Sequence, residues 1–213
     1  MEKSILISEI KEILVTENDL SYLEKIDDKT IEKIHKEIQG YIQRTEELQK
    51  PVFKVMAVAT QFIPNFIIAK LAHDYLTPYI IAQVVIYMDP KAAAKIGKSL
   101  RIDYMGQVAL YANPEVTARV GNLMEVNITA QVVKDLVTKN FTGKLGELAD
   151  LLDDKVLLDI VNALRDGKIV GNIANAMMNH EKIVRIAQQM PADIRNGAKM
   201  QLQTLGNKLA EQF

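Results

Sequence analysis

The sequence contains no cysteine and no tryptophan, and it has only 6 prolines and 10 glycines in 213 residues. Without cysteine the chain cannot form a disulfide, a thiolate zinc site or a cysteine nucleophile, which is compatible with a reducing compartment. Little proline and glycine, together with 48% hydrophobic residues, excludes a disordered or low-complexity chain. We therefore expect a globular protein of one domain, or of one domain with a small appendage.

Long apolar runs and an excess of charge are also missing. The longest segments without charge, residues 55–69 and 75–88, have 15 and 14 residues, and each contains a proline. A helix that spans a bilayer needs about 20 apolar residues. The formal net charge is −1, so no overall positive field attracts nucleic acid. We expect a cytoplasmic protein with no membrane insertion, for which a nucleic-acid partner is not favoured.

Motifs of catalysis are absent from the sequence. The three histidines, His35, His73 and His180, are far apart in the chain and form none of the zinc-binding spacings. There is no nucleophile elbow and no phosphate-binding loop of the strand–loop–helix type. The sequence therefore predicts a protein that is not an enzyme, with no catalytic residue and no cofactor.

An internal repeat with a period of twelve residues organises most of the chain. A small residue recurs at this interval, and a β-branched residue follows it two positions later. The small residues are Ala82, Ala94, Gly106, Ala118 and Ala130, and the β-branched residues are Val84, Ile96, Val108, Val120 and Val132. An apolar or small residue follows three positions after the first small one, and a further apolar residue six positions after it. With small slips, and an insertion at residues 138–141, we count eleven units between residues 52 and 190.

The spacing inside each unit is typical of an α-helix, because the two columns of smaller residues are three positions apart and the two columns of larger residues four apart, so that each pair lies on one face. Pro64, Pro78, Pro90, Pro114 and Pro191 lie where helices are expected to begin, and the residues before several of them can cap a helix. Helices of eight or nine residues are too short to be stable alone. We predict an all-α fold: an α-solenoid, a superhelix of about eleven short antiparallel helices with a 12–13-residue period.

The first fifty residues differ from the repeat in charge and pattern. They carry 12 acidic and 8 basic residues, whereas the rest of the chain carries 15 and 18. An apolar stripe runs along a predicted helix at residues 30–50, through Ile31, Ile34, Ile38, Tyr41 or Ile42, and Leu48. We predict two regions: residues 1–50 as an N-terminal helical cap or docking segment, and residues 51–213 as the helical-repeat domain. A homodimer formed through the 30–50 helix is an alternative use of the stripe.

Two units carry a resemblance to known proteins. The segment from Met88 to Leu100, which reads Met-Asp-Pro-Lys-Ala-Ala-Ala-Lys-Ile-Gly-Lys-Ser-Leu, resembles a unit of the cytosolic N-terminal superhelical domain of MgtE-type magnesium transporters. It is also similar to helical repeats of the flagellar motor switch protein G. The segment from Ala112 to Met124 has the same character. The resemblance covers residues 52–190 and implies the fold, whereas the regulatory and membrane domains that follow in the transporters are not found in these 213 residues.

Two charge clusters are candidate binding sites. Lys91, Lys95, Lys98 and Arg101 form a basic strip on one predicted helix and its exit, which could bind an acidic protein partner. Without interleaved aromatic residues it is a poor nucleic-acid site. Asp150, Asp153 and Asp154 are candidate ligands for a divalent cation, although carboxylates at helix joints also serve as caps.

The function that the sequence favours is a non-enzymatic protein–protein interaction scaffold that uses an extended helical-repeat surface. The alternative is a cytosolic regulatory or divalent-metal-responsive module of a membrane or motor complex, with the acidic cluster as its sensor. The sequence does not name the partner.

Overall fold

The computed structural model describes residues 3–14, 16 and 18–213, and within them it contains helices and the joints between helices but no strand. The α-helices are α1 (Lys3–Ile13), α2 (Asp28–Ala59), α3 (Asn65–Tyr75), α4 (Pro78–Val85), α5 (Pro90–Gly97), α6 (Ile102–Tyr111), α7 (Pro114–Gly121), α8 (Val126–Thr138), α9 (Thr142–Leu151), α10 (Asp154–Leu164), α11 (Gly167–Ala176), α12 (His180–Gln189) and α13 (Ala192–Thr204). Three short 3-10 helices are η1 (Ser21–Lys25), η2 (Thr60–Phe62) and η3 (Lys208–Gln212).

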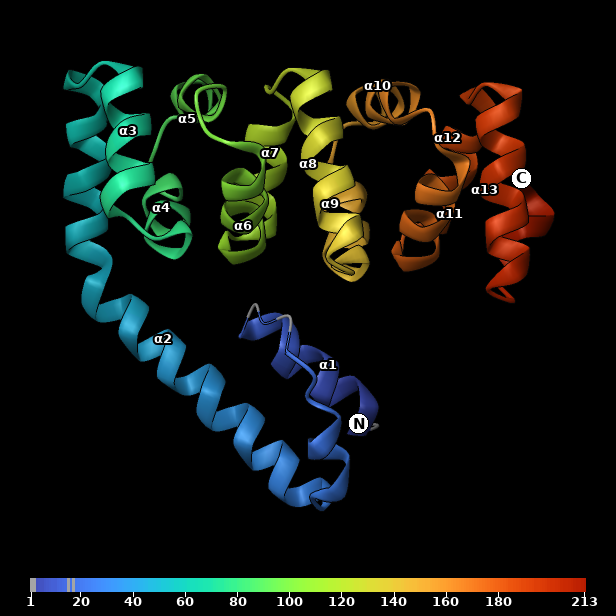
Figure 1. The fold of residues 1–213 in the computed structure, drawn as a ribbon, viewed down its shortest axis with the longest axis horizontal. Coiled ribbons are helices and arrows are strands. Elements are labelled where there is room, and N and C mark those ends of the chain that lie inside the picture. Colours follow the sequence, from blue (N-terminus) through green and yellow to red (C-terminus); the bar gives the residue numbers. More distant parts are fainter. Residues whose placement is uncertain (1–2, 15, 17) are drawn as a thin grey trace.

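The helices form an extended stack, shown in Figure 1 with its length horizontal. Each helix packs mainly against the next but one along the chain, so that α2, α4, α6, α8, α10 and α12 form one row and α3, α5, α7, α9, α11 and α13 form the other. One helix from each row makes a layer. The prediction of an all-α fold built from a stack of short helices is therefore confirmed, and the eleven predicted units correspond to the end of α2 and the helices from α3 to α12.

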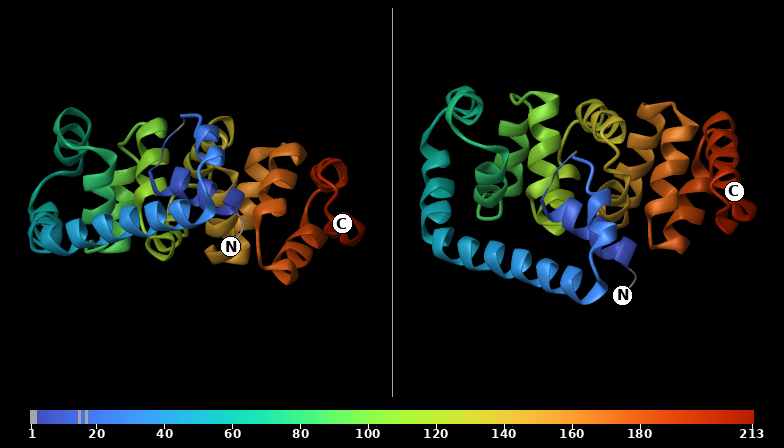
Figure 2. Two further views of the ribbon diagram at one scale, coloured as in Figure 1. Left: turned by 90° about the horizontal axis from the view of Figure 1, so that it is seen from below. Right: turned by 60° about the horizontal axis from the view of Figure 1, so that its bottom comes forward.

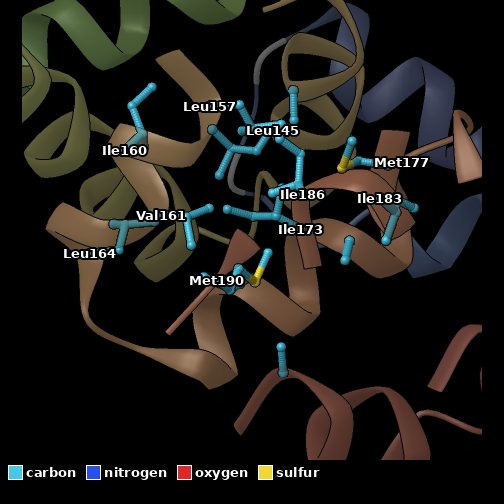
Figure 3. Close-up of a cluster of buried hydrophobic side chains, with 14 of the residues drawn as sticks. Leu145, Leu157, Ile160, Val161, Leu164, Ile173, Met177, Ile183, Ile186 and Met190 are labelled. Carbon is cyan, nitrogen blue, oxygen red and sulfur yellow. The ribbon is translucent and has the colours of Figure 1, made fainter. Parts of the chain in front are cut away.

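The small residues of the repeat lie at the contacts between layers. All five residues of the small column, from Ala82 to Ala130, are buried. Larger apolar side chains fill the space between the two rows, most extensively from α8 to η3, where they form one continuous core. Figure 3 shows part of this core, with Leu157, Ile173 and Ile186 pointing toward one another. A helix of ten residues is thus held by the layers on either side of it.

The predicted helix starts are largely confirmed. Pro78, Pro90 and Pro114 are the first residues of α4, α5 and α7, and in each case the side chain of the preceding residue accepts a backbone hydrogen bond from the first turn. Pro64 and Pro191 lie one residue earlier than predicted, because α3 and α13 begin at the residue after the proline.

Helix α2 is much longer than the repeat predicts. It runs through 32 residues and contains Pro51 in its interior, so the predicted boundary between residues 50 and 51 falls inside one continuous helix. Figure 1 shows a bend in α2 between a diagonal first part and an upright second part. Proline inside a helix removes one backbone hydrogen bond and bends the axis, which accounts for a change of direction without a break.

The N-terminal segment forms a hairpin with its own small core. Helix α1 and η1 pack against the first part of α2, around Leu6, Ile10 and Ile31, with Leu20 and Leu23. The upright second part of α2 belongs to the stack, where Phe53 and Ala57 are buried with Val84. Figure 1 and Figure 2 place α1 beside the middle of the stack, away from the end formed by α2 and α3.

Candidate interaction surfaces

Exposed apolar side chains are concentrated at one end of the stack. In the part of the chain that the structure describes, ten of the eighteen well-exposed large apolar residues lie between residues 41 and 75, and only five lie in the 138 residues that follow. Isolated exposed apolar residues are normal on a soluble protein, whereas a concentration of them marks a surface that another molecule covers.

The outer side of α2 carries an apolar seam with the spacing of a coiled coil. Its positions alternate in steps of four and three: on α2 they are Tyr41, Thr45, Leu48, Val52, Val55 and Ala59, and the next step falls on Phe62 in η2. The buried residues Phe53 and Ala57 lie on the opposite side of the helix, facing α4. Leu48 and Phe62 are each 82% exposed. The seam therefore points away from the stack, with nothing from the described residues covering its middle.

This seam is the continuation of the stripe predicted on the 30–50 helix. The first part of that stripe, Ile31, Ile34 and Ile38, packs against α1 and η1 within the chain. From Tyr41 onward the large apolar residues of the same stripe are exposed. The intramolecular contact thus uses one half of the stripe and leaves the other half open.

Helix α3 extends the apolar surface across the first layer. Its buried residues, Ile68, Ala69 and Ala72, face α5. On the other side it exposes Phe66, which is 71% exposed, and Ile67. We define the N-terminal end face as the outward apolar residues of α2, η2 and α3, namely Leu48, Val52, Val55, Phe62, Phe66 and Ile67. Lys70 and Asp74 are the charged residues on the outward side of α3.

A cleft separates the N-terminal hairpin from the stack. It has a volume of about 660 Å³, and its walls come from the end of α1, the middle of α2, and the stack between α4 and α9. Tyr79 and Tyr111 line it with their rings 5.8 Å apart in an edge-to-face arrangement, and Phe141 and Lys144 line it further along the stack. The cleft is concave, unlike the end face, and its lining includes the polar residues Gln83, Asn113 and Lys144.

In the structure, two of the four residues of the predicted basic strip are paired with carboxylates of the described residues and two are not. Lys91, Lys95, Lys98 and Arg101 are all exposed on α5 and the joint that follows it. Lys98 forms an ion pair of 2.7 Å with Glu125, and Arg101 pairs with Asp103, whose carboxyl pKa it holds below the ordinary value. Only Lys91 and Lys95 then offer free charge, which is a small footprint for an acidic partner.

The three acidic candidates serve the joints between layers. The Asp150 carboxylate accepts backbone hydrogen bonds from Met178 (2.7 Å) and Asn179 (3.2 Å), ahead of α12. Asp153 is the N-cap residue of α10; its side chain makes no capping hydrogen bond, but its backbone N–H donates to Oδ1 of Asn122 at 3.0 Å. Asp154 accepts a hydrogen bond of 3.0 Å from Arg185, which lowers its carboxyl pKa. Among the described residues no group of three or more potential ligands is placed to hold a metal ion.

Lys182 is the buried partner of this acidic region. Only 4% of its surface is exposed, and its ammonium group donates to the carbonyl oxygens of Asp150 (3.1 Å) and Leu152 at the end of α9. Burial lowers its pKa, while the Asp154 carboxylate, 3.7 Å away, favours the charged form. Lys182, which belongs to α12, thus caps the carbonyl groups at the C-terminal end of α9 and links the two helices.

Sequence reasoning predicted neither the end face as a whole nor the role of Lys182. A usable signal for the first was the 4-3 spacing that continues through Val52 and Val55 to Phe62. The signal for the role of Lys182 was the repeat itself, because polar contacts between layers join residues 27 to 32 positions apart, as in the pairs Lys98–Glu125 and Lys182–Asp150.

No helix in the described part of the chain combines the length and apolarity needed to cross a membrane. Comparisons with models of protein families, with curated proteins and with solved structures find no match for this chain.

Proposed function

We propose that this chain is a non-enzymatic protein–protein interaction scaffold, whose helical stack presents the N-terminal end face to another protein molecule. The observation that carries the proposal is the concentration of exposed apolar side chains on the first layer, against their scarcity on the layers that follow. The cysteine-free composition favours a cytoplasmic location, which is part of the proposal.

The chemistry of the end face favours a protein over other ligands. Its two phenylalanines and its aliphatic side chains form a broad surface on helices rather than an enclosed pocket. Aromatic anchors surrounded by aliphatic contacts are the usual centre of a protein interface. Nucleic acid would need a basic surface, and the outward side of α3 carries only one lysine, Lys70, beside Asp74.

Quantitative affinity capture from the native host tests the proposal. The wild-type chain is compared with Phe66→Asp and Val55→Asp, which place a carboxylate on the end face without touching a buried residue. Met178→Asp is the matched control, because Met178 is 86% exposed but lies between α11 and α12, far along the chain from the end face. A stoichiometric protein partner should be recovered with the wild type and the control and lost with both end-face variants. Equal recovery with all four chains would refute the use of this face.

A further inference from the structure

We infer that the molecule bound at the N-terminal end face is a second copy of this chain, related to the first by a two-fold axis, so that the α2–α3 layers of two copies stack against each other. The inference rests on the proposed function, because it names the partner of the same surface.

The end face has the form of one side of a helical layer. In the rest of the stack this side of each layer is covered by the next layer, through contacts between helices two apart in the chain. The surface that complements it is therefore another layer with an uncovered apolar side. In the described residues such a layer occurs at the N-terminal end, and a second copy supplies the same layer.

The C-terminal end of the stack is closed, which favours a dimer over a filament. Helix α13 packs closely on α11, and η3 folds back onto α13, so that Leu202, Leu209 and Ala210 are buried. An end face that met the C-terminal end of another copy would find no matching apolar layer there. Pairing of two identical end faces is self-complementary and leaves no further face open, as expected for a closed two-fold dimer.

The exposed area is sufficient for a stable dimer. With aromatic side chains contributing 150–250 Å² each, the exposed fractions of the six end-face residues amount to roughly 700 Å² per chain before any polar rim is counted. Stable interfaces bury about 800 Å² on each partner. Apolar area of this size is also more than a monomer usually leaves in water in one place.

Spacing and charge are also compatible with self-pairing. The 4-3 seam of α2 can pack against an identical seam from the partner, because such seams interlock with one another. On α3, Lys70 and Asp74 are one turn apart and of opposite sign. A two-fold axis that makes the two α3 helices antiparallel brings Lys70 of each copy toward Asp74 of the other, so the charges of the face are self-complementary.

Sedimentation equilibrium of the purified full chain, between 1 and 100 µM, tests the inference. The wild type should have twice the mass of the chain at the upper concentrations, with no larger species. Val55→Asp and Phe66→Asp should weaken association at least 100-fold, and Met178→Asp should leave it unchanged. Circular dichroism should show the same helicity for all four proteins, since each substituted residue is exposed.

A charge exchange identifies the pairing. Lys70→Asp and Asp74→Lys should each weaken the dimer, and the double variant should restore it, because the exchange recreates the same pairs across the axis. Since the chain has no cysteine, K50C, at an exposed residue of α2 outside the end face, also provides a single attachment point for a spin label, and a label–label distance can then arise only between two copies.

Three outcomes would overturn the inference. A wild-type chain that is monomeric at 100 µM excludes the second copy, and a mass that grows continuously with concentration excludes the closed two-fold dimer. A dimer that Val55→Asp and Phe66→Asp leave intact places the contact elsewhere. If the chain is monomeric but its end-face variants lose a different captured protein, the second-copy inference fails while the proposed scaffold function stands.

Discussion

The two ends of the stack are built from the same kind of helical layer but are finished differently. At the C-terminal end the chain continues past the last unit as α13 and η3 and folds back, so that Ala198 and Leu202 are fully buried. At the N-terminal end the chain enters through α2, whose first part leads away from the layer toward the hairpin. A layer is covered only where the chain beyond the repeat returns to it, and at the N-terminal end it does not.

Packing between layers also differs between the two halves of the stack, and it is closer in the C-terminal half. In the C-terminal half, Gly167 of α11 lies so close to α13 that an added Cβ would be 2.6 Å from the Cα of Gly197. In the N-terminal half, a Cβ added to Gly97 would meet only methionine side-chain atoms: the sulfur and methyl carbon of Met124, at 3.2 and 3.4 Å, and the sulfur of Met105, at 3.8 Å. The helices at the closed end are thus in backbone contact, whereas those nearer the open end are separated by flexible side chains.

The largest expected effect is from a cavity at the closed end. Leu202→Ala removes a fully buried leucine of α13 from the continuous core. We expect the free energy of unfolding to fall by roughly 2–5 kcal/mol, the range for a leucine deleted from a packed core. Urea denaturation followed by circular dichroism measures the change. Leu205→Ala, three residues further on and 45% exposed, is the control and should cost much less. Equal losses for the two would mean that this end is not packed as described.

Two separate glycine-to-alanine substitutions compare the close and the looser contacts between layers. A Cβ on Gly146 would lie 2.5 Å from the backbone carbon and oxygen of Ala176, so Gly146→Ala forces α9 and α11 apart. We expect a loss of about 1–3 kcal/mol from overpacking. Gly97→Ala meets a methionine that can move, and alanine favours a helix, so its effect should be close to zero or slightly stabilising. Urea midpoints give both values, and a costly Gly97→Ala would contradict the looser packing of the N-terminal half.

Replacing the buried Lys182, which also lies in the C-terminal half of the stack, should lower the free energy of unfolding by a smaller amount. Lys182→Met keeps much of the side chain but leaves the carbonyl oxygens of Asp150 and Leu152 without their donor. The expected cost is about 1–2 kcal/mol, as for buried polar groups that lose a partner. Arg185→Met, which breaks an exposed ion pair with Asp154, is the control and should cost less than about 1 kcal/mol.

The lowered pKa of Lys182 also predicts that the free energy of unfolding depends on pH. Burial lowers its pKa in the folded chain below the ordinary value of 10.5, so the unfolded chain holds this proton more tightly. Stability rises with pH wherever the unfolded state binds more protons. The advantage of the wild type over Lys182→Met should therefore grow as the pH is raised from neutral toward 10.5. Paired urea titrations at several pH values measure it, and a shrinking advantage would show that the charged form is the one the fold favours.

Much of the fold could be predicted because its signals are local. A proline at the first position of a helix and a capping side chain before it, as at Asp89 and Pro90, depend on a few neighbouring residues. The small column follows from the contacts that every layer repeats. The predicted change from cap to repeat at residues 50 and 51 leaves no break in α2, because tertiary contacts of α2 on both sides of Pro51 keep the helix continuous.

The candidate surface could be predicted only in part, since exposure depends on the rest of the molecule. The stripe beginning at Ile31 is visible in the sequence, but whether α1 covers all of it or half of it is decided by the path of the chain. The same holds for Asp150, which reads as a possible metal ligand until the joint before α12, 28 residues further on, is placed against it. Residues that are close in sequence reveal helices, and residues from neighbouring layers reveal sites.

The smallest expected effect on the single chain comes from the open end. Leu48→Ala is the same chemical change as Leu202→Ala, but Leu48 is 82% exposed, so it loses little buried area and the stability of the monomer should change by less than about 0.5 kcal/mol. Urea midpoints at 1 µM and at 100 µM separate the two states. If the end face is covered in a dimer, Leu48→Ala lowers the midpoint at the high concentration only, because association adds stability by mass action. A substitution of Leu48 that changes stability only in the dimer would show that the second copy covers the N-terminal end of the stack, as α13 and η3 cover the C-terminal end.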